Sequence, residues 1–309
     1  MNISRKLIAH FLLLLVNLFY GVNFVVSKSL MPDFLQPQAF ILIRVSVTVA
    51  LFFLVDFFWV NEKIHKRDIP LLFGCAMFGV VINQEMFFAG LNLTTPVNGA
   101  LIMIMTPILV LVVSFFLGYE KVKWFKAAGI LLGALGAFLI ISGKGFGFSS
   151  KTMKGDFFIL LNAASYAVYL VMVRPLMKKY HPMTVIKWVF LFGLAPVIFL
   201  GWGQFQTIQW QTFTPSIWIA LAFVVICVTF CAYLFNILAL REVDSSVVGA
   251  YIYLQPIFAA ILSAFFKYDT FDMMKIVAAA CIFSGVFLVA FGSYFFEKKQ
   301  LPESIIEEI

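Results

Sequence analysis

Long apolar stretches alternate with short polar links along the whole of this chain. A helix that crosses a lipid bilayer needs about 20 apolar residues. Within lipid, every backbone polar group must be paired inside the spanning segment, so these stretches are expected to be helices and not strands. The pattern predicts an all-α polytopic membrane protein with ten transmembrane helices, over residues 7–27, 38–60, 69–91, 96–118, 124–142, 155–174, 184–203, 215–239, 245–266 and 273–295.

The second half of the chain repeats features of the first half at a shift of 145–149 residues. Residues 94–120 and 243–269 each hold an apolar helix broken by a proline, Pro107 in the first and Pro256 in the second. Each half has five predicted helices, an odd number, so the second copy must lie upside down in the membrane. Inverted repeats of this kind are a device of secondary transporters. The predicted divisions are a first five-helix repeat at 1–147, a second at 148–296 and a cytoplasmic tail at 297–309.

Polar side chains inside the apolar stretches recur at helical spacing, as Asn17, Tyr20 and Asn23 do in the first helix. Such residues are costly in a membrane and usually face a bundle interior or a water-filled cavity. They either hold the helices together or line a solute cavity, whose amides and tyrosines suit small organic solutes of moderate polarity. The candidates for this cavity wall are Asn17, Tyr20, Asn23, Asn83, Gln84, Asn98, Met103, Thr106, Asn162, Tyr166, Tyr169, Tyr233, Asn236, Tyr251 and Gln255.

Two charged residues are predicted to lie within the membrane. Glu85 stands well inside an apolar stretch, where an ionised acid costs about 2.5–3.5 kcal/mol. It either couples transport to protons or pairs with Arg44 or the adjacent amides. Arg44 lies early in the second helix. It either binds a carboxylate of the substrate or pairs with Asp33, Glu85 or a backbone carbonyl.

Pro107 and Pro256 fall inside corresponding helices of the two halves. Proline removes an intrahelical hydrogen bond and kinks the helix. The kink is either a static bend or the hinge of a gate, and we expect a hinge. The two helices end on Glu120 and Asp269, which are expected to hold the start of the next helix or nearby lysines in place.

Composition and charge agree with a membrane protein. Charged residues make up 12% of the chain, against roughly 25% in soluble domains. The net charge of +7 arises from lysines and arginines in the short links, which signal topology rather than nucleic-acid binding. Their distribution favours both termini in the cytoplasm. The four cysteines all lie in apolar stretches and indicate neither a disulfide framework nor a metal site.

Several of these segments resemble the EamA-type branch of the drug/metabolite transporter superfamily. The resemblance lies in YGVNFVVSK in the first helix, GLNLTTPVNGALIMIMTP across the third and fourth, and GILLGALGAFLI in the fifth. It implies a bacterial inner-membrane carrier that exports amino acids or related metabolites, with the fifth and tenth helices outside a basket formed by the others. The chain departs from the family pattern at Tyr20, where tryptophan is frequent, and at Asp269, where glutamate is usual.

The sequence therefore predicts a secondary transporter, acting as a monomer or homodimer, that moves small organic solutes outward by alternating access. A passive channel or facilitator with the same cavity remains an alternative, as does a membrane scaffold that transports nothing. An enzyme is not expected, because the chain offers no nucleophile–base set, metal cluster or nucleotide-binding loop. No cofactor is expected, and protons are the candidate coupling ion.

Overall fold

The computed structural model describes residues 3–60, 62–94, 99, 102–142, 153–265 and 273–297. Within these residues the regular structure is helical, and no strand occurs there. The helices are α1 (Ile3–Leu30), α2 (Pro37–Trp59), η1 (Lys66–Asp68), α3 (Ile69–Ala76), η2 (Met77–Val81), α4 (Ile82–Leu93), α6 (Met105–Phe116), α7 (Trp124–Ser142), α8 (Met153–Met172), α9 (Arg174–Lys179), α10 (Pro182–Phe205), η3 (Trp210–Thr212), α11 (Pro215–Phe223), η4 (Val224–Cys231), α12 (Ala232–Glu242), α13 (Ser245–Ala250), η5 (Tyr251–Tyr253), α14 (Leu254–Phe265) and α15 (Met273–Glu297).

Seven helical stretches in the described residues are long and apolar enough to cross a membrane, and Met105–Phe116 and Trp124–Leu139 are shorter apolar helices. Large apolar side chains point outward from them: Phe57, Phe116 and Phe199 are 79%, 79% and 86% exposed. A surface of this kind suits lipid rather than water. The predicted all-helical, polytopic membrane protein is confirmed, while most of the first turns of the predicted helix 96–118 lie outside the described residues.

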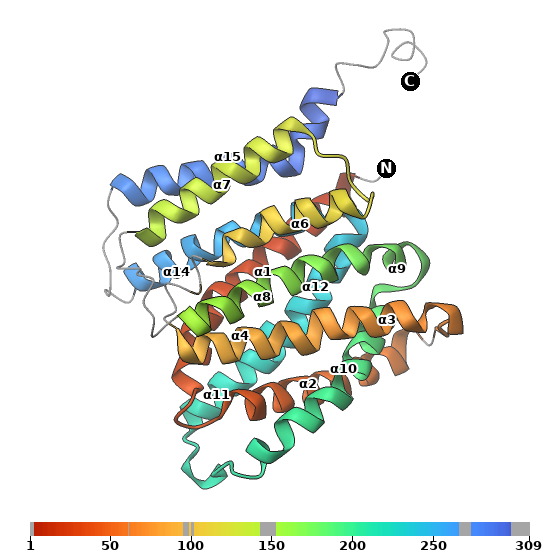
Figure 1. Ribbon diagram of the computed structural model, residues 1–309, viewed down its shortest axis with the longest axis vertical. Coiled ribbons are helices and arrows are strands. Elements are labelled where there is room, and N and C mark those ends of the chain that lie inside the picture. Colours follow the sequence, from red (N-terminus) through yellow and green to blue (C-terminus); the bar gives the residue numbers. More distant parts are fainter. Residues whose placement is uncertain are drawn as a thin grey trace.

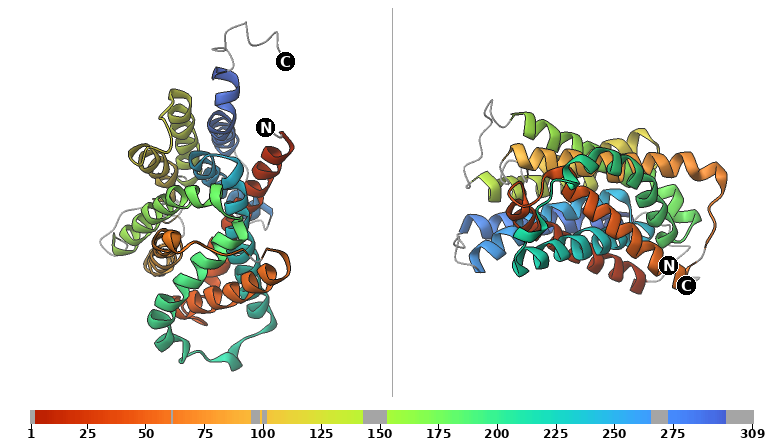
Figure 2. Two further views of the ribbon diagram at one scale, coloured as in Figure 1. Left: turned by 90° about the vertical axis from the view of Figure 1, so that its right-hand side faces the viewer. Right: turned by 90° about the horizontal axis from the view of Figure 1, so that it is seen from below.

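The helices lie side by side, with their axes across the long dimension of the molecule (Figure 1). Figure 2, left, looks along many of them nearly end-on. The pair α7 and α15 forms one extremity of the stack, and the pair α2 and α10 forms the other. The first turns of α1 and the last turns of α15 lie at the same end of the helices, which is called the terminal end below.

Contacts between the helices follow a regular scheme. Helix α4 packs against α8, and α12 packs against α1. Helix α6 also packs against α8, and α14 also packs against α1. Helices α1 and α8 therefore each touch two helices from the other half of the chain. The middle of the stack is built from segments that are distant in the sequence.

Two of the long helices contain a π-helical segment, η2 between α3 and α4 and η4 between α11 and α12. A π-segment leaves carbonyl groups available to other partners and is frequent at functional sites. In η2 the Phe78 carbonyl accepts a 2.5 Å hydrogen bond from Ser165, and the Gly79 carbonyl accepts a 3.0 Å bond from Tyr233. In η4 the Val224 carbonyl accepts a 2.8 Å bond from Thr229. These side chains stabilise the π-segments.

The helices that contain Pro107 and Pro256 are arranged alike. Helix α6 begins two residues before Pro107, and α14 begins two residues before Pro256. The 3₁₀ turn η5 separates α13 from α14. Since proline is tolerated in the first turn of a helix but not in its interior, it marks a new helix start in both places. The sequence predicts the breaks, and the hinge role of these prolines stays a prediction.

Small residues bring α7 and α15 into close contact. A Cβ at Gly285 would lie 2.5 Å from the Gly129 carbonyl oxygen and 2.6 Å from the Gly133 nitrogen. These atoms belong to the backbone and cannot move aside as a flexible side chain does. Gly129 and Gly133 of α7 therefore lie against the backbone of α15, and small residues at such contacts are common between membrane helices.

Replacing Gly285 with alanine is expected to lower the stability of the purified protein by about 1–3 kcal/mol, because the two helices must separate to admit the methyl group. Thermal unfolding in detergent measures this as a lower Tm. Gly203→Ala in α10 is the matched control, since a Cβ there meets no atom within 4 Å. Equal Tm values for the two variants would contradict the described packing of α7 on α15.

Candidate functional site

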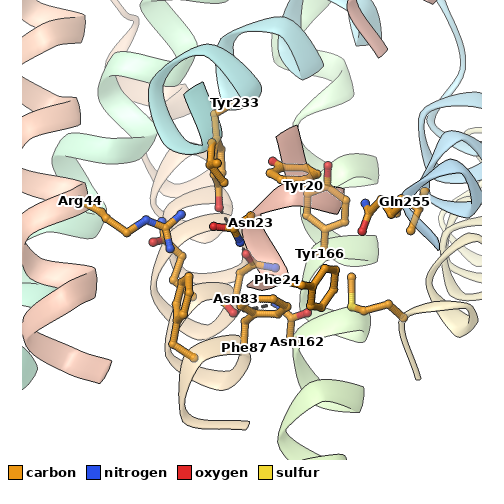
Figure 3. Close-up of a pocket in the computed structure, with 15 residues that line it drawn as sticks. Tyr20, Asn23, Phe24, Arg44, Asn83, Phe87, Asn162, Tyr166, Tyr233 and Gln255 are labelled. Carbon is orange, nitrogen blue, oxygen red and sulfur yellow. Dashed lines mark hydrogen bonds between the residues drawn. The ribbon is translucent and has the colours of Figure 1, made fainter. Parts of the chain in front are cut away.

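A buried cavity lies in the middle of the bundle (Figure 3). It offers about 80 Å³ of space to the centre of a water molecule, and this exceeds the minimum of roughly 10–15 Å³ that one water requires. None of the described lining residues comes from α7 or α15. The lining residues are Tyr20, Asn23, Phe24, Arg44, Asn83, Gln84, Phe87, Phe88, Met103, Asn162, Tyr166, Val228, Tyr233, Ile252 and Gln255.

Hydrogen bonds between helices hold the polar part of this wall in place. Tyr233 donates from α12 to the Asn83 side-chain oxygen, at 3.3 Å, in addition to its bond with Gly79. Asn162 donates from α8 to the Asn83 carbonyl at 2.7 Å. The first residues of α4, directly after η2, are therefore fixed by both neighbouring helices. Both amides are among the residues that line the cavity.

The structure brings many of the sequence candidates together around the cavity. They come from six of the predicted transmembrane helices, and α2 adds Arg44 as a seventh contributor. The part these residues play in substrate binding stays a prediction. The candidates that line the cavity are Tyr20, Asn23, Asn83, Gln84, Met103, Asn162, Tyr166, Tyr233 and Gln255, together with Arg44.

Five other candidates lie behind or beside the wall. Asn17 accepts a 3.0 Å bond from Gln255, and Asn236 donates a 3.4 Å bond to Tyr20, so both support lining residues. Thr106 is fully buried, with its hydroxyl 3.8 Å from the Met103 sulfur.

The remaining two are Tyr169 and Tyr251. Tyr169 is buried beside Tyr166 with ring centroids 6.2 Å apart. Tyr251 is hydrogen-bonded to His10 at 2.9 Å and points away from the cavity lining. Asn98 lies outside the described residues.

Glu85 is buried in α4 but is not among the lining residues. Its carboxyl group contacts the Gln38 side chain, and one carboxylate oxygen has no hydrogen-bond partner in the described part of the chain. No ion pair joins it to Arg44 among the described residues. The pairing with Arg44 that was one alternative for Glu85 is therefore wrong, and the amide that its carboxyl group contacts is Gln38 of α2 rather than one of the adjacent amides.

A network of ion pairs lies at the terminal end of the bundle. Lys126 of α7 lies 2.8 Å from Glu120 and 2.8 Å from Asp244, and it donates to the Ser246 hydroxyl at 3.0 Å. Arg174 of α9 pairs with Glu120 at 3.4 Å and also with Asp244. The Ser246 hydroxyl donates to Glu120 at 2.6 Å. This terminal network joins the link between α6 and α7 to α9 and α13, and the expected contact of Glu120 with a lysine is confirmed.

Charge in the terminal network is balanced, with two acids against two bases. Burial by itself raises the pKa of Asp244, but Lys126 and Arg174 outweigh this effect and hold that pKa below its ordinary value. Asp244 is therefore ionised throughout the neutral range, and its contribution to stability is lost only as the pH falls through this lowered pKa. Asp244 therefore remains a charged partner of Lys126 and Arg174 at neutral pH.

Comparison with known proteins decides the family. The model of the EamA-like transporter family matches residues 7–142 and 153–291. This chain belongs to the EamA-like transporter family. The family is a branch of the drug/metabolite transporter superfamily, so the chain is a multi-pass membrane transporter and not an enzyme. Within the described residues, no group of three His, Cys, Asp or Glu side chains is placed to hold a metal ion.

Relatives of this EamA transporter carry names of the same kind. The uncharacterized transporter YetK of Bacillus subtilis is 24% identical over 92% of this chain and 85% of its own length. An uncharacterized transporter of Archaeoglobus fulgidus is 29% identical over 69% of this chain and 73% of its own length. A solved crystal structure shares the fold with a TM-score of 0.74 and 18% identity, over 94% of this chain and 98% of the other.

The polar stripes did not identify the apolar part of the cavity wall, which is formed by Phe24, Phe87, Phe88, Val228 and Ile252. A usable signal was present for the three phenylalanines. Each follows a polar lining residue by four positions, after Tyr20, Asn83 and Gln84, and residues four apart share a helix face. Val228 and Ile252 offer no such signal, because the residues four positions before them, Val224 and Val248, are apolar.

Proposed function

We propose that this EamA transporter is a secondary transporter that exports amino acids or related small organic metabolites by alternating access. The observation that carries the proposal is the cavity, whose wall combines several amides and tyrosine hydroxyls with phenylalanine rings. Small-molecule sites are typically apolar pockets with a few polar groups that fix orientation. A metabolite with a polar head and an apolar body matches this wall.

The pairing of the helices supports two inverted repeats. In the proposed repeat, α1 corresponds to α8, α4 to α12 and α6 to α14. Under this correspondence the contact of α4 with α8 becomes that of α12 with α1, and the contact of α6 with α8 becomes that of α14 with α1. The π-segments η2 and η4 also correspond. Two similar halves that enclose a midplane site are expected to rock about it.

The terminal network supplies a gate for this motion. Alternating access requires that each end of the cavity opens while the other is closed. We assign the terminal network to the gate at the terminal end. The distribution of lysines and arginines places this end on the cytoplasmic side of the inner membrane. Pro107 and Pro256 stand where α6 and α14 begin, close to the cavity residues Met103 and Gln255, and are proposed as hinges.

Counterflow in proteoliposomes tests the proposal. Vesicles that contain the purified protein are loaded with one unlabelled amino acid or metabolite at a time, and uptake of the same labelled solute is followed. A carrier is expected to accumulate label transiently above equilibrium for at least one solute. A channel would equilibrate the label without an overshoot, and a scaffold would give no flux. The assay is run at acidic and at neutral pH, because we also propose that Glu85 couples transport to protons.

A further inference from the structure

Arg44 brings a positive charge into the wall of the cavity. Its side chain is 3% exposed, and in Figure 3 its guanidinium extends toward Tyr233 and Asn23. A charged group within a membrane is costly unless it is paired or solvated, and such groups usually mark functional sites. The contacts of Arg44 therefore decide whether another group of the protein already neutralises its charge.

The contacts orient the guanidinium without neutralising it. Its Nε donates to the Thr229 hydroxyl at 2.9 Å. The guanidinium carbon lies 4.4 Å from the ring centroid of Phe88 and 5.3 Å from that of Phe40, which is cation–π distance. Its Nη1 is buried and has no hydrogen-bond partner among the described residues. One side of the group is anchored, and the other retains its hydrogen-bonding capacity.

Neither acid considered from the sequence neutralises Arg44. Glu85 contacts Gln38 and does not line the cavity. Asp33 lines a separate surface crevice. Within the described part of the chain, Arg44 makes no ion pair, and the remaining lining residues of the cavity are uncharged. The cavity wall therefore carries an unbalanced positive charge.

We infer that Arg44 is the receptor for a carboxylate group of the transported solute, an inference that rests on the proposed transport function. A planar guanidinium binds a carboxylate through two parallel hydrogen bonds, and charge-assisted bonds of this type are the strong ones. The anchor on Nε leaves the Nη groups for the ligand. Binding restores electrical neutrality in the cavity, so a carboxylate is favoured over a neutral or cationic head group.

The rest of the wall defines the rest of the solute. Phe24, Phe87 and Tyr166 provide apolar surface elsewhere in the same cavity. The side-chain oxygens of Asn23 and Gln255 can accept bonds from an ammonium, a hydroxyl or an amide. Carboxylic acids with an apolar body and the corresponding amino acids share the chemistry that Arg44 selects. An amine of the same shape lacks the carboxylate and brings a second positive charge into the cavity.

Two matched ligand series test this inference on the full-length purified protein. The first is phenylpropionate, phenylalanine, phenylpropionamide and phenethylamine, and the second is isocaproate, leucine, isocaproamide and isoamylamine. Binding is measured by calorimetry, without transport. In at least one series the acid or the amino acid is expected to bind about tenfold or more tightly than the amide and the amine, because one charge-assisted pair is lost. The ratio of acid to amino acid identifies which of the two is the better ligand.

Variants then assign the preference to Arg44. Arg44→Gln is expected to abolish the preference for the carboxylate, and Arg44→Lys to keep it with weaker binding, because lysine retains the charge but not the two-bond geometry. Arg241→Gln removes an exposed arginine of α12 and is expected to leave binding unchanged. If Arg44→Gln does not fold, the ligand series on the unaltered protein and on Arg44→Lys still decide.

Equal binding of acid, amide and amine would overturn the inference, as would a carboxylate preference that persists in Arg44→Gln. Binding of neither series, in a protein that shows counterflow of a solute without a carboxylate group, would also overturn it while leaving the proposed transport function intact. Carboxylate-selective binding without any counterflow would separate the two proposals in the other direction. The site would then stand, and the proposed transport function would fail.

Discussion

Replacing Lys126 with glutamine is expected to raise the population of the state that is open at the terminal end by about tenfold or more. Lys126 bridges Glu120 and Asp244 and also bonds to Ser246, so its charge holds three groups from two parts of the chain. Hydrogen bonds to charged groups contribute about 1.5–3 kcal/mol each. Loss of 1.4 kcal/mol from the closed state alone would shift the equilibrium about tenfold. Arg174 still contacts both acids, so the variant is expected to fold.

The opening is measured by the labelling rate of a thiol placed behind the terminal network. Ser245 is fully buried, next to Ser246 in α13, and donates to the Leu170 carbonyl at 3.1 Å. Ser245→Cys is introduced into a background without the four native cysteines. A maleimide that does not cross membranes then reports access. The labelling rate is expected to rise about tenfold or more when Lys126→Gln is added.

Lys121→Gln is the matched control for charge, because Lys121 lies in the same link and is exposed. It is expected to leave the labelling rate unchanged. The same slow rate in the Lys126 variant as in its parent would show that the terminal network does not hold this end closed. Counterflow in the Lys126 variant is expected to fall as well, since a carrier that favours one open state returns slowly.

The helices were predictable because a bilayer leaves few options. An apolar stretch of sufficient length must form a helix, so the extents of α2 and α10 follow closely from the sequence ranges 38–60 and 184–203. The π-segment η2 was not predictable. It depends on bonds from Ser165 and Tyr233, which are 87 and 154 residues away from their acceptors. The local sequence around η2 therefore cannot predict these contacts.

The polar half of the cavity was predictable for a related reason. Amides are rare in lipid, so Asn23 and Asn162 stand out against an apolar background, whereas Phe87 is one apolar residue among many. A stripe predicts a face of the helix but not a depth along it. Tyr251 shows this limit, because it lies in the same predicted helix as Gln255, over 245–266, and yet bonds to His10 away from the cavity.

The sequence pattern predicted only part of the terminal network. The position of Glu120 before the start of α7 predicts contact with a nearby lysine, and Lys126 is six residues away. Asp244 is 118 residues from Lys126, and Arg174 is 54 residues from Glu120. Their convergence depends on how the two halves of the chain pack. The sequence repeat suggests that packing but does not fix which side chains meet.

Filling the cavity is expected to abolish transport. Met103 lines the cavity and is partly buried. Tryptophan at this position therefore places a large indole ring in a cavity that offers only about 80 Å³ to the centre of a water molecule. Met105→Trp is the matched control, because Met105 begins α6 with 42% of its surface exposed. Both variants are expected to fold, since one fills a void and the other faces outward. The thermal stability of each variant in detergent checks this.

Counterflow of the best solute by these two variants tests most directly whether the cavity is the site of transport. The proposed function predicts that Met103→Trp gives no overshoot, while Met105→Trp gives the overshoot of the unaltered protein. A full overshoot in a folded Met103→Trp protein would contradict it, because solute would then cross the membrane without passing through this cavity.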